Sequence, residues 1–251
     1  MTDTLDGQLY AELNAAWAIA KKDIAIYYFK PNIIVSGALF PLFMFLAFAA
    51  GNSAGPAVMI PGLIAITILF SASSIEPVSI PIERRMKTFD RLISAPISLH
   101  AVVLGESLSG FLYSMGIALV PLIAGMLIFG TPIISIAPLV AGIILTSFCF
   151  ATMGTLFAAY PTESPGDIMS MLNLVRLPLI FISGVFIPIE SIPSIGQGAA
   201  YFSPLTYGND LIQAAYHGQT HFNPLLDIVM LCIFILIFQI FAHQLYKRWN
   251  E

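Results

Sequence analysis

The sequence has few charged residues for its length. Of its 251 residues, 10 are Lys or Arg and 14 are Asp or Glu, which is 10% of the chain, whereas a soluble domain carries about 25%. Because 58% of the residues are hydrophobic and the mean hydropathy is +0.88, the remaining charges are too few to cover the surface of a water-soluble globule. The composition argues against a soluble enzyme and predicts a membrane protein.

Other shortages exclude further classes of protein. A net charge of -4 argues against nucleic-acid binding, which needs a clustered basic excess. The two cysteines, Cys149 and Cys232, fall inside apolar runs, so they are interpreted as small hydrophobic residues and not as a disulfide or metal site. No lysine follows the glycine of a G-x-x-x-x-G-K-[ST] loop, so the chain itself is not expected to hydrolyse ATP by that route.

Side chains for catalysis or metal binding are equally sparse. His217 and His221 have a ligand-like i, i+4 spacing, but no H-E-x-x-H signature accompanies them. No Ser, His and acid residues gather in segments at a common depth. We therefore expect no metal site and no catalytic site.

What the sequence does have is a series of long uncharged runs. A bilayer core needs roughly 20 helical residues, and turn-forming clusters at 51–56 and 130–132 divide the longest runs into hairpins. The fold class predicted is an all-α polytopic membrane protein with six transmembrane helices in a single domain. Their expected ranges are 32–50, 56–80, 101–129, 133–160, 168–187 and 228–246.

Lysine and arginine positions predict the orientation. Three precede the first span, four lie between the second and third, Arg176 follows the fourth, and two end the chain. Because basic residues favour the cytoplasmic side, both termini are expected in the cytoplasm. The N-terminus lacks a basic region with a cleavage pattern, so no removable signal peptide is expected.

Residues 8–30 have the spacing of an amphipathic helix at the membrane surface. Its expected apolar face is Leu9, Leu13, Ala16, Trp17, Ala20, Ile24, Tyr27 and Tyr28. Such a helix either anchors the chain in the headgroup layer or also braces a partner subunit.

Residues 82–95, between the second and third spans, predict a short cytoplasmic helix that Ser94-Ala95-Pro96 ends. Met86, Phe89 and Ile93 would form an apolar ridge surrounded by charges of both signs. The ridge could be covered by lipid or by a socket in another protein.

The connection before the last span, 188–223, is too long for a turn and too apolar for an open loop. Pro188, Pro193 and Pro204 divide it into short pieces, which predicts outer re-entrant half-helices. Broken backbone at membrane depth requires protein or a cavity to satisfy its polar groups.

Three charges fall within the predicted spans, where burial costs at least roughly 2.5 kcal/mol each. Arg176 either pairs with Glu76 or Glu106, or extends its side chain to the headgroups. The halves of the chain show no convincing internal repeat, which weakens the alternative of an ion-coupled carrier.

The layout and two motifs resemble the membrane subunits of type-2 ABC exporters over nearly the whole chain. Residues 83–98, ERRMKTFDRLISAPIS, resemble the family's coupling-helix stretch, although Lys87 stands where glycine is usual. Residues 183–193, SGVFIPIESIP, with 203–207, SPLTY, resemble its outer signature, and Gln213 falls where arginine often follows.

The resemblance implies a non-catalytic permease of a prokaryotic inner membrane, with two cytosolic ABC subunits that bind ATP and Mg. It also implies a second permease copy, most simply in a homodimer, in contact with membrane lipid. Its coupling residues would be Glu83, Arg84, Arg85, Met86, Thr88, Phe89, Asp90, Arg91 and Ile93. Its outer motif would be Gly184, Pro188, Pro193, Pro204 and Tyr207.

The expected cargo is lipophilic or amphipathic, because size and loops are closest to drug-resistance-type exporters. Phe40, Phe43 and Phe48 would suit such a cargo, although a phenylalanine stripe more often faces lipid or packs in a core. The alternatives are export of a lipid-linked glycan, an ion-coupled carrier and a membrane scaffold.

Overall fold

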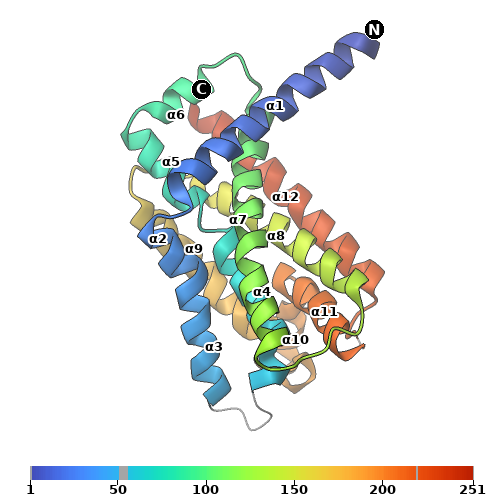
Figure 1. The fold of residues 1–251 in the computed structure, drawn as a ribbon. Coiled ribbons are helices and arrows are strands. Elements are labelled where there is room, and N and C mark those ends of the chain that lie inside the picture. The colour runs from blue at the N-terminus through green and yellow to red at the C-terminus, as the bar shows by residue number, and fades with distance from the viewer. Residues whose placement is uncertain (1, 51–55, 219, 251) are drawn as a thin grey trace.

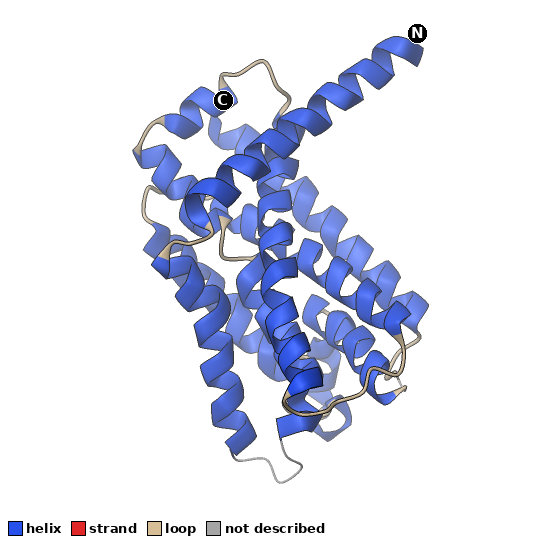
Figure 2. Ribbon diagram, viewed as in Figure 1, coloured by secondary structure: helices blue, strands red, loops and turns tan. Residues whose placement is uncertain are grey.

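The structure is a computed structural model that describes residues 2–50, 56–218 and 220–250, and every element in these ranges is a helix (Figure 2). Both termini, α5 and α6 lie at one end of a helical bundle, which we call the basic end, and α10 and α11 lie at the other, the α11 end (Figure 1). The first half of the chain contains α1 (Thr2–Tyr27), α2 (Pro31–Ile34), the π-helix η1 (Val35–Leu39), α3 (Phe40–Ala50), the 3₁₀ helix η2 (Pro56–Met59), α4 (Ile60–Ala72), α5 (Glu76–Arg85), α6 (Thr88–Ile93) and α7 (Leu99–Leu127). The second half contains α8 (Ile136–Ala158), α9 (Pro165–Ile182), the 3₁₀ helix η3 (Ile189–Ser191), α10 (Ser194–Ala200), α11 (Pro204–His217) and α12 (Pro224–Asn250).

Five helices of the described chain are long and apolar enough to cross a membrane. They are Ile60–Arg85, Leu99–Leu127, Ile136–Ala158, Pro165–Ile182 and Pro224–Arg248. The first span expected from the sequence, 32–50, is not among these five; within it, Val35–Met44 is a shorter apolar helix. The turn expected at 51–56 lies almost entirely outside the described residues.

Helix α4 forms the centre of the bundle. All of its residues are buried, and it packs against α7, α8 and α11. A helix that is hydrophobic all round needs burial on every side, and Thr67 and Ser71 are the polar side chains within it. Ser71 satisfies its hydroxyl by donating to the carbonyl of Thr67 at 2.6 Å.

The central span, which consists of α4 and α5, is interrupted within the range expected for the second transmembrane helix. The helix breaks at Ser73–Ile75, resumes at Glu76 as α5 and continues through Pro81 to Arg85. The second span expected from the sequence ends at residue 80, whereas this helix continues past Pro81 to Arg85. A proline removes the helical hydrogen bond from its own nitrogen, and in this chain the break falls just before Pro77, the other proline of the segment.

The coupling segment is shorter than expected. Residues 82–85 belong to α5, and the separate helix α6 covers only Thr88–Ile93, so the prediction of one helix over 82–95 is wrong. Lys87 separates the two because its backbone is left-handed, with φ of 59°. The family-typical glycine at this position would adopt that conformation without a Cβ penalty.

Helix α1 lies across α7 at the basic end (Figure 1). Its buried face is Ala16, Ile19, Ala20, Asp23 and Tyr27. Of the expected apolar face, Ala16, Ala20 and Tyr27 are buried against the chain, whereas Leu13 and Trp17 are about half exposed at 52% and 50%, as side chains that contact lipid would be. The buried face approaches α7 closely, since a Cβ on Gly105 would lie 2.8 Å from the Ala16 carbonyl oxygen.

Candidate functional site

The apolar ridge of the coupling segment faces the chain itself. Phe89 is 1% exposed and packs on Tyr246 of α12 with ring centroids 5.9 Å apart. Ile93 joins the same hydrophobic cluster, whereas Met86 is 65% exposed. The expectation of an outward ridge is therefore wrong for Phe89, because the phenyl ring is the contact that attaches α6 to α12.

Glu83 and Arg84 also make internal contacts. The Arg84 guanidinium donates to the carbonyl oxygens of Ala159 and Tyr160, just beyond the C-terminus of α8. A cation at this end of a helix satisfies orphan carbonyls and complements the helix dipole. Thr88 donates to the Glu83 carbonyl at 3.2 Å. Glu83 and Arg84 therefore hold the segment in shape and contribute little to its outer surface.

The exposed residues at the end of α5 and in α6 form a surface of mixed charge. We call this surface the tip surface, and its members are Arg85, Met86, Lys87, Thr88, Asp90 and Arg91. A cavity of about 250 Å³ adjoins it between α6 and the α8–α9 connection, with Lys87 and Asp90 on one side and Thr162 and Glu163 on the other. The expected coupling residues that are exposed to another protein are Arg85, Met86, Thr88, Asp90 and Arg91.

A buried charge cluster lies behind the tip, and sequence reasoning missed it. The Lys22 ammonium is 2.6 Å from Glu83 Oε1, 3.1 Å from Asp23 Oδ1 and 3.6 Å from Glu106 Oε1. The Tyr27 hydroxyl donates to the same oxygen of Glu83 at 3.3 Å. One lysine thus joins α1, α5 and α7. The sequence feature that could have predicted this cluster is Asp23, an acidic residue that lies among apolar residues at helical spacing on α1.

The cluster shifts the acid–base behaviour of α1. Burial raises the pKa of Asp23 from 3.8 to about 6, against the opposing attraction of Lys22. Burial alone lowers the pKa of Lys22, but Glu106, Asp23 and Glu83 together outweigh this effect and raise it above its ordinary value. Lys22 is therefore firmly charged and serves as the cation of the cluster.

Arg176 of α9 is fully buried and holds the break in the central span. Its guanidinium donates to the Ser73 carbonyl, to the Ser73 hydroxyl at 2.7 Å and to the Ser74 hydroxyl at 3.1 Å. Within the described chain it forms no direct salt bridge with Glu76 or Glu106, although it lies close enough to Glu76 for their charges to attract each other. Because the side chain is fully buried, the prediction that it extends to the headgroups is wrong. Ser73 and Ser74 provide the acceptors for the guanidinium group. Nothing in the sequence indicated that these two serines would bind Arg176.

Glu76 occupies a crossing of three helices. It is fully buried, and its Oε1 accepts from the Gly110 nitrogen of α7 at 2.9 Å. A Cβ on Gly110 would lie 2.5 Å from Glu76 Oε1, and one on Gly154 of α8 would lie 2.8 Å from Oε2. The two glycines therefore make the space for this carboxyl group.

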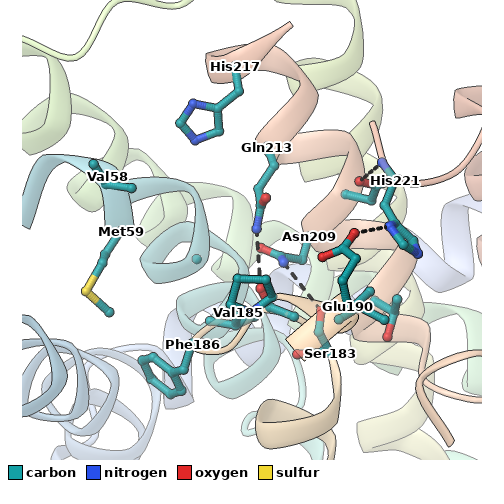
Figure 3. A pocket seen from close by; sticks show the side chains of 16 residues that line it. Val58, Met59, Ser183, Val185, Phe186, Glu190, Asn209, Gln213, His217 and His221 are labelled. Atoms are coloured by element: carbon teal, nitrogen blue, oxygen red, sulfur yellow. Dashed lines mark hydrogen bonds and ion pairs between the residues drawn. The ribbon is translucent and has the colours of Figure 1, made fainter. Parts of the chain in front are cut away.

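Of the outer-motif residues, Gly184 and Pro188 line a cavity of about 260 Å³ at the α11 end, which Figure 3 shows from close by. Gly184 has φ of 76° and turns the chain beyond α9. Pro188 lies in the cavity wall just before η3, and Pro193 precedes α10. Pro204 begins α11, and the buried Tyr207 donates its hydroxyl to the Tyr201 carbonyl at 2.7 Å.

Side chains of α11 and the following loop fix this cavity. The amide nitrogens of Asn209 and Gln213 each donate at 3.4 Å, to the carbonyls of Ser183 and Gly184 respectively (Figure 3). His221 Nδ1 lies 2.6 Å from Glu190 Oε1. Gln213, where the family often has arginine, thus contributes a neutral amide.

Metal binding has no geometric support in the described ranges. Among these residues, no group of three or more His, Cys, Asp or Glu side chains is arranged to hold a metal ion. His217 lines the cavity of the α11 end, and His221 is occupied with Glu190. The i, i+4 pair therefore does not form a cluster.

Comparison with known proteins places the chain in a family. Residues 14–217 match the family ABC-2 type transporter. Nodulation protein J of Rhizobium leguminosarum bv. viciae is 27% identical over 171 residues, 64% of this chain and 62% of that relative. Its counterpart in biovar trifolii is 28% identical over 164 residues, 60% of this chain and 57% of that relative. The chain thus spans less than two thirds of the length of these two relatives.

A third relative aligns over more of the chain. The inner membrane transport permease YadH of Escherichia coli (strain K12) is 21% identical over 192 residues, 76% of this chain and 74% of that relative. The family match includes the coupling segment, the central span and α11. The chain therefore belongs to the ABC-2 type transporter family.

Proposed function

We propose that the chain is the permease of an ATP-driven exporter whose ATP and Mg are bound by separate ABC subunits, two per complex. The observation that carries this is the tip surface at the end of the central span. Arg85, Met86, Lys87, Asp90 and Arg91 are exposed at the basic end, and α5 connects them directly to the fully buried α4.

This connection allows a partner to move the bundle. Phe89 attaches α6 to α12 through Tyr246, and Arg84 attaches α5 to the end of α8. A displacement of the tip therefore acts on three transmembrane helices at once. A ligand shifts such an equilibrium only by its differential affinity for the two states, and in this proposal ATP, bound by the partner, provides that difference.

The proposed membrane arrangement has six spans with both termini cytoplasmic. Residues 31–50 form a nearly uninterrupted helix of roughly 30 Å at 1.5 Å per residue, long enough for one bilayer core. Exposed apolar side chains on α3, α9 and α12, among them Phe43, Leu174 and Leu236, are accounted for by lipid and by a second copy of the chain.

The cargo proposed is lipophilic or amphipathic, with a lipid-linked glycan as the alternative. Because α4 fills the centre of the helical bundle, the transport path is expected between two copies of the chain and not through a single copy. Phe40 and Phe43 of α3 are 40% and 64% exposed and provide an apolar surface for such a path. The side chain of Phe48 lies outside the described residues.

The test is co-purification of an ATPase with the tagged full-length chain from its native membrane in mild detergent. Met86→Asp places a charge where an apolar contact is expected, and Arg91→Glu reverses a charge of the tip surface. Each is expected to lower the recovered ATPase about tenfold, equivalent to about 1.4 kcal/mol of binding.

Lys21→Glu is the matched control for Arg91→Glu, because Lys21 is also exposed at the basic end but belongs to α1. It is expected to leave the recovered ATPase unchanged. Full recovery of a P-loop ATPase with both tip variants would refute the proposed docking surface. Purification of the chain without any ATPase, even after crosslinking, would refute the exporter proposal.

A further inference from the structure

The cavity at the α11 end has one polar wall and one apolar wall. The polar wall is a stripe along α11, and the apolar wall comes from η2, α4 and the loop after α9. The polar members are Thr206, Asn209, Asp210, Gln213 and His217; the apolar members include Val58, Met59, Val185, Phe186 and Ile189. A ligand that fills this space needs a polar edge and an apolar face.

Two buried atoms of the polar wall lack a partner. Asn209 Oδ1 and Thr206 Oγ1 are inaccessible and form no hydrogen bond with any described residue, in side chains that are 3% and 1% exposed. Buried polar atoms of this kind are rare unless a ligand or water satisfies them. Because the Asn209 carbonyl oxygen can only accept, its missing partner must be a hydrogen-bond donor.

The charges around the cavity are already engaged. Both carboxylate oxygens of Asp210 accept backbone hydrogen bonds at 2.8 Å, one from His221 and one from Phe222. Glu190 is paired with His221. A cationic ligand therefore finds no free carboxylate, while an anionic ligand would bring further acceptors next to the unpaired oxygen atoms of Asn209 and Thr206. A neutral donor such as a hydroxyl group fits both conditions.

The volume limits the size of the ligand. The cavity measures about 260 Å³, whereas pockets for drug-sized ligands measure about 300–1,000 Å³. The loop approaches so closely because Gly62 has no side chain; a Cβ there would lie 2.9 Å from Val185 Cγ1. The cavity suits a single ring or headgroup and not a whole lipophilic molecule.

We propose that this cavity binds a neutral, hydroxyl-bearing headgroup, such as one sugar ring, on an amphipathic cargo. Hydroxyl groups donate to Asn209 and Thr206, and the apolar face of the ring lies against the opposite wall. The assignment of this ligand to exported cargo rests on the proposed function. Binding itself rests only on the cavity.

The test measures occupancy of the cavity in the full chain, in lipid nanodiscs that leave both ends accessible. His217→Cys, in a Cys232→Ala background, places a thiol at the exposed rim, while Cys149 is buried. The measured quantity is the rate of reaction with a hydrophilic maleimide. Methyl β-D-glucopyranoside is the probe, and choline and acetate are the charged comparisons.

We expect the glucoside to slow labelling about fourfold at three times its dissociation constant, because about a quarter of the sites then remain free. Choline and acetate are expected to leave the rate unchanged. Thr206→Val, which keeps the size of the side chain and removes the hydroxyl, and Gln213→Leu are each expected to raise the half-protecting concentration about fivefold. Gln244→Leu, at an exposed position of α12, is the control and is expected to have no effect.

Absence of protection by the glucoside, or equal protection by choline or acetate, would overturn the inference. The inference would also be overturned if neither Thr206→Val nor Gln213→Leu changed the glucoside concentration that gives half-protection. If Gln213→Leu fails to fold, the result for Thr206→Val alone decides. ATPase co-purification without glucoside protection would leave the proposed function standing and refute only this inference. Protection without any ATPase would support the cavity and refute the exporter.

Discussion

The Lys22 ammonium lies 2.6 Å from the Glu83 carboxylate and joins the N-terminal helix to the last turn of α5. Glu83 is followed within a few residues by the tip surface, so α1 is attached close to the expected partner contact. Glu106 of α7 shares the same lysine. In the proposed exporter, α1 and α7 therefore move together with the tip.

Lys22→Met should destabilise the chain, because it leaves three buried carboxylates without their cation. We expect a loss of about 2–3 kcal/mol, below the range for a fully buried pair because Lys22 retains some exposure. Unfolding in detergent micelles measures this. Lys21→Met removes an exposed neighbouring charge and should cost less than about 0.5 kcal/mol. Equal losses in the two variants would show that the cluster does not contribute.

Asp23 should give the stability a pH dependence of known sign. Its pKa is raised from 3.8 to about 6 by burial, so between these values the folded chain retains a proton that the unfolded chain has released. The stabilisation from Asp23 is therefore greatest below pH 3.8 and falls as pH rises toward about 6. The measurement compares melting temperatures of the wild type and Asp23→Asn across this window. A constant difference between them would contradict the assignment.

Gly110→Ala should prevent correct packing of α7. Its Cβ would lie 2.4 Å from the Ala72 carbonyl oxygen and 2.5 Å from Glu76 Oε1, and the backbone oxygen cannot move without shifting α4. Gly116→Ala, on the same helix with open space around it, should instead stabilise by about 0.5–1 kcal/mol. Yield and melting temperature after purification separate the two. A well-folded Gly110→Ala protein would show that Glu76 does not sit at this crossing.

Arg176→Lys should destabilise the break in α4–α5 although the charge is kept. A guanidinium fork reaches the Ser73 carbonyl and both serine hydroxyls, whereas an ammonium group cannot reproduce that planar geometry. We expect a loss of about 1.5–3 kcal/mol in unfolding experiments. Ser74→Ala, which removes one acceptor, should cost about 1 kcal/mol. If Arg176→Lys leaves the free energy of unfolding unchanged, only the positive charge is required at this position.

The sequence was sufficient to predict the long apolar helices, because uncharged runs of about 20 residues have few other solutions. It was insufficient for the interruption at Ser73–Ile75. Either of the two prolines of this segment, Pro77 and Pro81, can end a helix, but the interruption lies just before Pro77, and Pro81 lies inside α5. Arg176, which holds that interruption, lies about 100 residues further along the chain.

Faces of helices were harder to predict than their existence. Helical spacing on α1 fits more than one apolar face, and contact with Gly105 of α7 selects the one that buries Asp23 and exposes Trp17. Similarly, Phe89 was expected to face a partner, but Tyr246 from the far end of the chain covers it. The cavity at the α11 end likewise depends on side chains from three separated segments.

Lys87→Gly should leave the stability nearly unchanged, while Lys87→Val should reduce it. The left-handed backbone at φ of 59° costs a non-glycine residue about 1–2 kcal/mol, and glycine removes this cost but loses about 0.5–1 kcal/mol through its freedom in the unfolded chain. A β-branched valine is strained further at positive φ. Unfolding in detergent measures the order Gly ≥ Lys > Val. The ion pair with Glu163, at 3.8 Å between exposed side chains, is too weak to reverse it, and Lys87→Gln, which removes only the charge, should behave as the wild type. A valine variant as stable as the glycine variant would show that Lys87 does not hold the left-handed turn between α5 and α6.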